Sequence, residues 1–158
     1  METDYDFIIV GSGGGAFCAA LVMRAAGKRV LILEKTALLG GTTAISGGVM
    51  WIPNNRFMAE HGIADSAEQA NTYLDHVVGD ADDTPGASPE RRRTYVDQAP
   101  AMIDFLVAQG IKLRRIPVWP DYCDVPGAVA QGRTVTSELF DINTLGVWKK
   151  KLRPGFLP

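Results

Sequence analysis

Two short apolar runs near the start of the chain are separated by a glycine-rich turn and a helical pattern. Residues 7–10, Phe-Ile-Ile-Val, and residues 30–33, Val-Leu-Ile-Leu, each have the length and composition of a buried strand. Between them, small and apolar side chains recur from Ala16 to Met23, and Gly27 follows where a helix would end. This order predicts a strand, a helix and a second strand, the βαβ unit of an α/β fold.

Capping residues predict two helices in the middle of the chain. Ser66 and Gln69 have the spacing of a capping box ahead of an apolar pattern that Gly79 closes. Ser88-Pro89-Glu90 opens another helix, with proline at the first helical position. The two helices make a helical insertion over about residues 64–110.

Proline and glycine mark where regular structure stops. We expect Pro100 to break or kink the second helix and to leave a further segment over 101–109. The acidic, turn-rich stretch 80–86 is expected to be an exposed loop, and 112–116 a short strand. Beyond that strand, prolines and a glycine indicate irregular backbone over 117–127.

The turn after the first apolar run carries the glycine fingerprint of a dinucleotide-binding unit. Gly11 permits the tight turn, Gly13 lets the backbone approach a pyrophosphate, and Ala16 lets the helix lie against the sheet. Amides at the helix N-terminus then face the phosphates. A purely structural glycine-rich turn is the alternative, but the surrounding strands and helix favour the dinucleotide. The residues predicted to face the pyrophosphate are Gly11, Ser12, Gly13, Gly14, Gly15 and Ala16.

An acidic residue, Glu34, ends the second apolar run about twenty positions after the fingerprint. A carboxylate there can accept hydrogen bonds from both hydroxyls of an adenosine ribose, and it disfavours a 2′-phosphate. The unit is therefore predicted to bind an unphosphorylated adenine dinucleotide and not NADP.

A second glycine-rich segment follows at residues 40–48. Four glycines and three hydroxyl side chains disfavour the interior of a helix or strand here. They offer many amides and hydroxyls to a polar ligand. The segment could run back along the pyrophosphate toward a flavin ring, whereas its alternative interpretation is a flexible surface loop. Its candidate cofactor contacts are Gly40, Gly41, Thr42, Thr43, Ser46, Gly47 and Gly48.

Composition and charge narrow the range of partners. With 158 residues the chain has the size of one domain, and its net charge of −2 argues against nucleic acid. The basic clusters 91–93 and 149–153 could contact phosphate or anionic lipid, although a solvated surface is favoured for both. No cysteine or histidine has a partner at metal-ligand spacing, so no metal is expected. The start of the chain carries no signal-peptide pattern, and we expect a cytoplasmic protein.

Several of these motifs together resemble the 3-ketosteroid dehydrogenase branch of the fumarate reductase/succinate dehydrogenase flavoprotein superfamily. The similarity rests on the fingerprint, on Glu34-Lys35-Thr36 and on the second glycine-rich segment with the stretch Val49-Met50-Trp51-Ile52-Pro53-Asn54-Asn55. The stretch Trp51-Ile52-Pro53-Asn54, with Pro120-Asp121-Tyr122 later, points to the steroid branch. The resemblance implies FAD as a tightly held cofactor, with Lys35 and Thr36 flanking its adenine.

The resemblance also implies a reaction. In this family a tyrosine removes a proton next to the ketone of a 3-ketosteroid while a hydride passes to the flavin N5. Tyr122 matches a tyrosine at the substrate that supports the base, and its alternative role is to pack a proline-rich turn. The substrate is thus expected to be a small molecule, a 3-ketosteroid. No motif specifies the electron acceptor, and a bulky sterol-like substrate would make peripheral membrane contact useful.

The expected fold is α/β, a Rossmann-like FAD/NAD(P)-binding domain with three layers and a parallel sheet, incomplete, with the start of a substrate or catalytic domain. We expect residues 1–116 to belong to the FAD-binding domain and 117–158 to begin the substrate-binding region. The general base has no candidate here, so we expect an N-terminal fragment that is inactive alone. The alternatives are a fumarate reductase-like flavoprotein acting on an unsaturated acid and a non-catalytic flavin-binding fragment.

Overall fold

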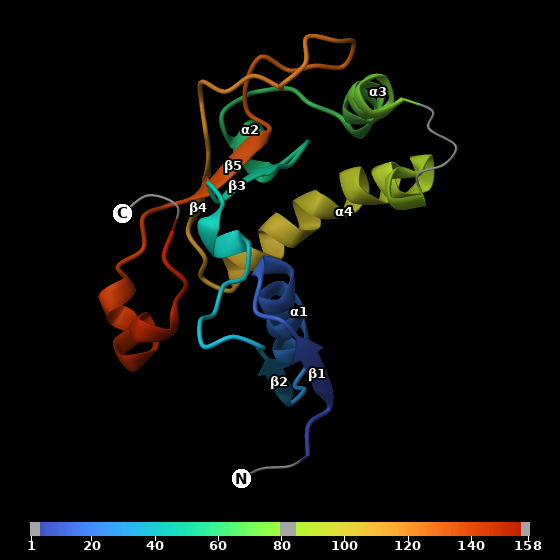
Figure 1. Cartoon of the computed structure of the whole chain (residues 1–158). Helices are drawn as coiled ribbons and strands as arrows, with labels where there is room; N and C mark the ends of the chain where they lie inside the picture. The colour runs from blue at the N-terminus through green and yellow to red at the C-terminus, as the bar shows by residue number, and fades with distance from the viewer. Residues whose placement is uncertain (1–3, 80–84, 156–158) are drawn as a thin grey trace. The chain divides into compact units, whose positions relative to one another are not determined.

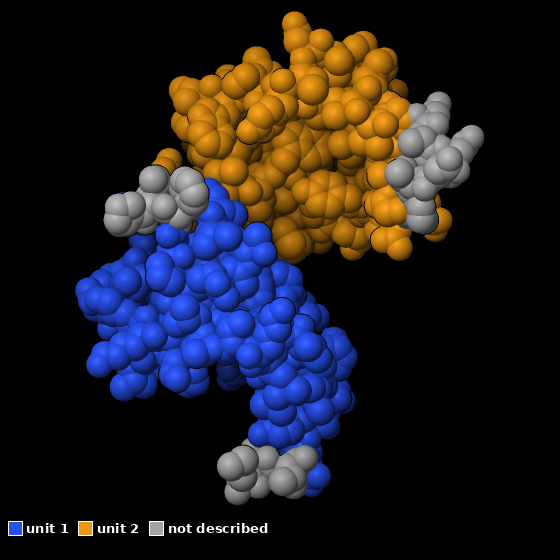
Figure 2. All heavy atoms as spheres, viewed as in Figure 1, with its two compact units in different colours: residues 1–48, 139–158 blue, residues 49–138 orange. Residues whose placement is uncertain are grey.

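The computed structural model describes residues 4–79 and 85–155, and Figure 1 shows the course of the chain. The chain divides into two compact units, coloured separately in Figure 2. Unit 1 comprises Met1–Gly48 with Leu139–Pro158, and unit 2 comprises Val49–Glu138. The expected domain boundary after residue 116 falls inside unit 2, and the assignment of 117–158 to a substrate-binding region stays a prediction.

Unit 1 contains the predicted strand, helix and strand. The two strands pair in parallel with Phe7 opposite Val30, and the helix packs against both. At the helix end Gly27 has φ +75°, and the Lys28 amide donates to the Met23 carbonyl at 3.0 Å, which is a Schellman cap. The βαβ prediction is therefore confirmed. The elements of unit 1 are β1 (Phe7–Val10), α1 (Gly14–Ala25), β2 (Val30–Leu33) and two 3-10 segments, η1 (Thr43–Ile45) and η3 (Ile142–Lys151).

The parallel sheet of unit 1 has two strands among the described residues. Along β1 only Ile9 is buried, whereas Ile8 is 56% and Val10 85% exposed. Strands of a parallel sheet normally carry a layer on each face, which is why both faces of β1 are apolar. The described residues thus form the βαβ portion of the expected three-layer fold.

Unit 2 is built on a small antiparallel sheet in the order β3-β5-β4. In the register of this sheet, Met50 and Arg115 both lie opposite Val135, which is fully buried. The strand predicted at 112–116 is therefore confirmed in its central residues. The elements of unit 2 are β3 (Val49–Trp51), α2 (Arg56–Glu60), α3 (Ala67–Val78), the 3-10 turn η2 (Pro85–Ala87), α4 (Pro89–Ala108), β4 (Leu113–Arg115) and β5 (Thr134–Ser137).

Both predicted helices of unit 2 begin at their predicted caps. The Ser66 hydroxyl accepts from the Gln69 amide at 3.1 Å ahead of α3, and Gly79 with φ +69° ends that helix. Ser88 caps α4, whose first residue is proline. Most of the loop expected at 80–86 falls on residues 80–84, outside the described residues.

Of the two outcomes expected at Pro100, the break is wrong, because α4 continues through this residue as one helix, and the kink stays a prediction. A proline inside a helix removes one backbone hydrogen bond and costs about 3 kcal/mol. Val96 and Ala99 on one side of Pro100, and Ile103 on the other, are buried along one face. Burial of that face on both sides of the proline offsets the lost hydrogen bond.

The basic cluster at the start of α4 is only partly solvated. Arg91 and Arg93 are exposed as expected, but the solvated-surface interpretation is wrong for Arg92, which is 7% exposed. Its guanidinium pairs with Asp75 of α3 at 3.0 Å and donates to the Gly79 carbonyl at 3.1 Å. Arg92 therefore joins the two helices.

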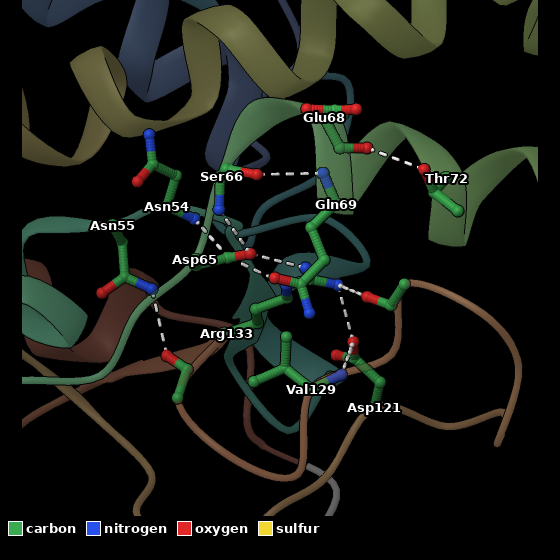
Figure 3. A network of polar contacts seen from close by, with 12 residues as sticks. Asn54, Asn55, Asp65, Ser66, Glu68, Gln69, Thr72, Asp121, Val129 and Arg133 are labelled. Carbon is green, nitrogen blue, oxygen red and sulfur yellow. Dashed lines mark hydrogen bonds and ion pairs between the residues drawn. The ribbon is translucent and has the colours of Figure 1, made fainter.

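At the centre of unit 2, Arg133 is fully buried between two carboxylates (Figure 3). Its Nη2 and Nε atoms donate to the two carboxylate oxygens of Asp65 at 2.6 and 2.9 Å, and its Nη1 donates to Asp121 at 2.8 Å. The guanidinium also lies 5.4 Å from the centre of the Trp51 ring and 5.8 Å from that of Tyr73. We call these five residues the Arg133 cluster.

The carboxylates of the Arg133 cluster are satisfied by further donors. Asp65 accepts from the amides of Asn54 and Ser66 at 2.8 and 2.9 Å, so that four donors reach its two oxygens. Asp121 accepts from the Trp51 indole at 2.7 Å and the Val129 amide at 3.0 Å. Buried charges are tolerated when they are paired and hydrogen-bonded, and this cluster meets both conditions.

Within the part of the chain that the structure describes, no helix has the length and apolarity needed to cross a membrane.

Candidate dinucleotide site

The glycine turn of unit 1 leaves the start of α1 open to a ligand. Gly11 has φ +98°, and its amide donates to the Leu33 carbonyl at 2.7 Å, which fixes the turn at the end of β1. Gly13 is the N-cap of α1, and no side chain of that residue can cap the helix. The first amides of a helix have no partner within the helix, so the turn can present them to an anion.

The second glycine-rich segment lies against this turn, as the sequence predicts. The Gly14 amide donates to the Thr43 hydroxyl at 2.9 Å, and the Gly40 amide donates to the Ser12 hydroxyl at 2.9 Å. A β-carbon on Gly41 would lie 3.5 Å from the Gly13 α-carbon, so the two backbones run in close approach. The flexible-loop alternative for residues 40–44 is therefore not supported.

Gly40 is the position where this segment most requires glycine. Its φ is +114°, and a β-carbon there would lie 2.7 Å from the Ala44 side chain. Ser46 shapes the rest of the segment: its hydroxyl donates to the Thr43 carbonyl at 2.8 Å and accepts from the Gly48 amide at 3.2 Å. These hydrogen bonds make the segment an ordered turn that contains η1.

Glu34 is held by donors of its own chain. Its Oε2 accepts from the buried Ser12 hydroxyl at 2.6 Å, and its Oε1 accepts from the Thr36 amide at 3.0 Å. The Ser12 hydroxyl is the largest cause, and the Thr36 amide the next, of a Glu34 pKa lowered to about 2. The carboxylate is thus ionised at neutral pH and fixed in one orientation.

Glu34 keeps acceptor capacity for a ligand. A carboxylate has about four acceptor positions. The Thr36 hydroxyl carries one proton, and its 2.8 Å contact with the Leu38 carbonyl competes with its 3.2 Å contact with Glu34. Part of its acceptor capacity therefore remains for the hydroxyls of a ribose.

Glu34 and the glycine turn border one cavity of about 420 Å³. Three of its lining residues were not predicted from the sequence as cofactor contacts: Val10, Ile45 and Arg153. The predicted site residues that line it are Gly11, Ser12, Gly13, Glu34, Lys35, Thr36, Gly41 and Thr42.

The other predicted cofactor residues lie outside the lining of this cavity. Gly40 joins it through its hydrogen bond to the lining residue Ser12. The residues that the lining does not include and that make no such bond to it are Gly14, Gly15, Ala16, Thr43, Ser46, Gly47 and Gly48. Their contact with a cofactor stays a prediction.

Tyr122, the predicted substrate-side residue, belongs to unit 2 and projects entirely into solvent at 101% exposure. Its two neighbours are fixed: Asp121 belongs to the Arg133 cluster, and the Cys123 amide donates to the Tyr73 hydroxyl at 3.2 Å. The packing alternative for Tyr122 is wrong in this structure, because an exposed ring packs nothing. An exposed side chain on a fixed backbone is suited to contact a partner or a substrate.

A larger hollow of about 900 Å³ lies in unit 2 along α3 and α4. Its lining mixes Leu74 and Met102 with polar side chains of α4, and it includes no predicted site residue. The larger hollow therefore lacks the predicted dinucleotide-binding residues, which line the smaller cavity.

The geometry defines a dinucleotide-binding protein, and comparisons identify its family. The sequence model described as "FAD binding domain" matches residues 6–156, and the chain belongs to this family. The residues fit its cofactor FAD, because the glycine turn, the close backbone approach and the ribose acid surround one cavity. The fold and cofactor predictions are thereby confirmed.

The relatives indicate a branch of this family. The 3-oxosteroid 1-dehydrogenase of Mycolicibacterium smegmatis is 36% identical over 97% of this chain, and 26% of that relative is covered. The 4-oxocyclohexanecarboxylate 2-dehydrogenase of Sinomonas cyclohexanicum is 41% identical over 91% of this chain and 25% of its own length. The chain thus spans about a quarter of the length of these relatives.

A solved structure shows the same similarity in three dimensions. The 3-ketosteroid delta1-dehydrogenase from Sterolibacterium denitrificans, in complex with 1,4-androstadiene-3,17-dione, matches 96% of this chain and 26% of its own with a TM-score of 0.82. The two sequences are 39% identical. The resemblance to the steroid dehydrogenase branch is confirmed.

Proposed function

We propose that this chain supplies the ADP-binding part of an FAD-dependent enzyme that dehydrogenates 3-ketosteroids. One observation carries the cofactor half of this proposal: the ionised Glu34 lines the cavity of the glycine turn and keeps part of its acceptor capacity. The steroid half is supported by the similarity to steroid dehydrogenases over nearly the whole chain.

Each part of the cavity has a role in this proposal. The turn from Gly11 to Ala16 faces the pyrophosphate, Glu34 holds the adenosine ribose, and Lys35 with Thr36 flanks the adenine. Bound FAD supplies an acceptor for a hydride equivalent. The second glycine-rich segment, from Gly40 to Gly48, orients the cofactor toward its flavin end.

Tyr122 is the residue of this chain that we place at the substrate. A phenol can both donate and accept a hydrogen bond, so it can support a base that removes a proton next to a ketone. The anchored neighbours of Tyr122 keep its backbone in one place while its side chain reaches outward. The general base itself is proposed to come from another part of the enzyme.

The test uses the protein at its full natural length. Anaerobic addition of 4-androstene-3,17-dione should bleach the visible absorbance of its flavin, because the steroid would reduce it. A Tyr122→Phe variant should retain the flavin and bleach more slowly. Absence of flavin, or a bound flavin that no 3-ketosteroid bleaches, would contradict the proposal.

Two other outcomes correspond to the alternative functions. If the reduced flavin were reoxidised by fumarate or another unsaturated acid and not by a dienone steroid, the protein would be an acid reductase. If flavin bound but reacted with neither class, the protein would be a non-catalytic flavin-binding protein.

A further inference from the structure

The cavity beside Glu34 is also lined by a cation from far along the chain, Arg153. Two backbone hydrogen bonds place it there: the Leu39 amide donates to the Lys151 carbonyl at 2.6 Å, and the Arg153 amide donates to the Leu39 carbonyl at 2.8 Å. Leu39 and Leu152 form a parallel bridge between these bonds. The position of Arg153 is therefore fixed by the segment that leads into the second glycine-rich turn.

The guanidinium of Arg153 lacks an anionic partner among the described residues. It is half-buried, and none of the ion pairs of the described chain includes it. Its Nη2 lies 3.5 Å from the Thr36 hydroxyl, at the limit of a hydrogen bond. Its Nε is inaccessible to solvent and meets no acceptor within residues 4–79 and 85–155. Apart from the marginal contact with Thr36, no acceptor of the described residues meets the guanidinium, so its Nη donors are suited to an anionic ligand.

We propose that Arg153 binds a phosphate of the adenosine half of the dinucleotide. This inference rests on the proposed FAD site and not on the steroid reaction. A pyrophosphate bound in this cavity carries negative charge close to the ionised Glu34, and a guanidinium reduces the repulsion between the two. Arginine also offers two parallel N–H donors to a phosphate, which a lysine cannot do.

The in-plane Nη donors of Arg153 favour a phosphate over the adenine ring. Stacking of the guanidinium on adenine would leave its in-plane donors without acceptors, whereas phosphate oxygens would satisfy them. The glycine turn, which is proposed to hold the pyrophosphate, lines the same cavity as Arg153.

Calorimetric titration of the flavin-free full-length protein with ADP and, separately, with adenosine tests this role. Arg153→Gln should weaken ADP binding by about 10-fold to 100-fold and leave adenosine binding unchanged. Arg153→Lys keeps the charge without the paired donors, so its ADP affinity should lie between those of the wild type and Arg153→Gln. Lys150→Gln removes an exposed charge from the same segment and should leave both affinities unchanged.

The outcomes separate this inference from the function on which it rests. Equal losses of ADP and adenosine affinity in both Arg153 variants would show that Arg153 shapes the site or contacts the nucleoside, and would overturn the phosphate role. Wild-type ADP affinity in Arg153→Gln would overturn it as well and would leave the dinucleotide site intact. A wild-type chain that binds neither ADP nor FAD would overturn both the site and the role of Arg153.

Discussion

The two units of this chain use carboxylates surrounded by hydrogen-bond donors in opposite ways. In unit 2, the side chain of Asp65 is 1% exposed and receives four donors, so its acceptor capacity is filled by the protein. In unit 1, Glu34 is fixed by Ser12 and Thr36 but borders a cavity and keeps part of its capacity. A filled cluster stabilises the fold, whereas a partly filled cluster beside a cavity can bind a ligand.

The apolar residues of the two units differ in the same way. The core of unit 2 includes Ile52, Met58 and Ile103, each exposed by 1% or less. In unit 1, Ile8 and Val10 of β1 are largely exposed. Unit 2 therefore derives more of its stability from its own burial, and unit 1 has more to gain from binding a ligand.

The largest expected effect on stability comes from removing the cation of the Arg133 cluster. Arg133→Met leaves Asp65 and Asp121 buried without their cation, and loss of one partner of a buried pair costs about 3–5 kcal/mol. Urea unfolding should show this loss, and hydrogen exchange should place the lost protection in unit 2. Arg114→Met, on the exposed side of β4, should change the free energy of unfolding little. Comparable stability of Arg133→Met and the wild type would show that the cluster does not hold unit 2 together.

A smaller effect on stability is expected from a substitution at Gly40, whose amide bonds to the cavity residue Ser12. Gly40→Ala forces a side chain into a left-handed conformation 2.7 Å from Ala44, and such strain costs about 1–3 kcal/mol. We expect a lower free energy of unfolding together with weaker FAD binding, because the Gly40 amide holds Ser12 beside Glu34. In Gly86→Ala the new methyl group meets nothing within 4 Å and should change neither quantity. Undiminished FAD affinity in Gly40→Ala would show that this turn does not support FAD binding.

The smallest effect is a pH dependence caused by Glu34. Its pKa is lowered from 4.5 to about 2, so the stability it contributes is complete above pH 4.5 and is lost as the pH falls toward 2. Glu34→Gln should therefore reduce the acid sensitivity of unfolding between these values, whereas the exposed Glu138→Gln should not. Identical acid titrations of the wild type and Glu34→Gln would contradict the hydrogen bonds assigned to this carboxylate.

The parts predicted from the sequence are those determined by near neighbours. The βαβ unit follows from two apolar runs and a glycine turn within residues 7–33, and α3 follows from the Ser66 cap. Glu34 is predicted as a site residue because its distance from the fingerprint is set by one helix and one strand. In each case the residues that carry the sequence pattern are close in sequence to the element that they predict.

The parts that the sequence did not reveal depend on distant partners. Strand β5 has four residues and pairs with β3, more than eighty positions earlier. The burial of Arg133 requires Asp65, 68 positions away, and the placement of Arg153 requires Leu39. A short strand or a single arginine carries no local signal for such a partner. The continuity of α4 through Pro100 was missed for the same reason, because its burial is a tertiary effect.

We propose that Glu34 holds the FAD ribose. An FAD titration of three proteins tests this most directly. The wild type and the exposed control Glu60→Ala should bind FAD equally. Glu34→Ala should bind FAD about 10-fold to 100-fold more weakly, because it loses the charge-assisted hydrogen bonds to the ribose. Wild-type affinity in Glu34→Ala would show that the ribose is held elsewhere and would contradict the account.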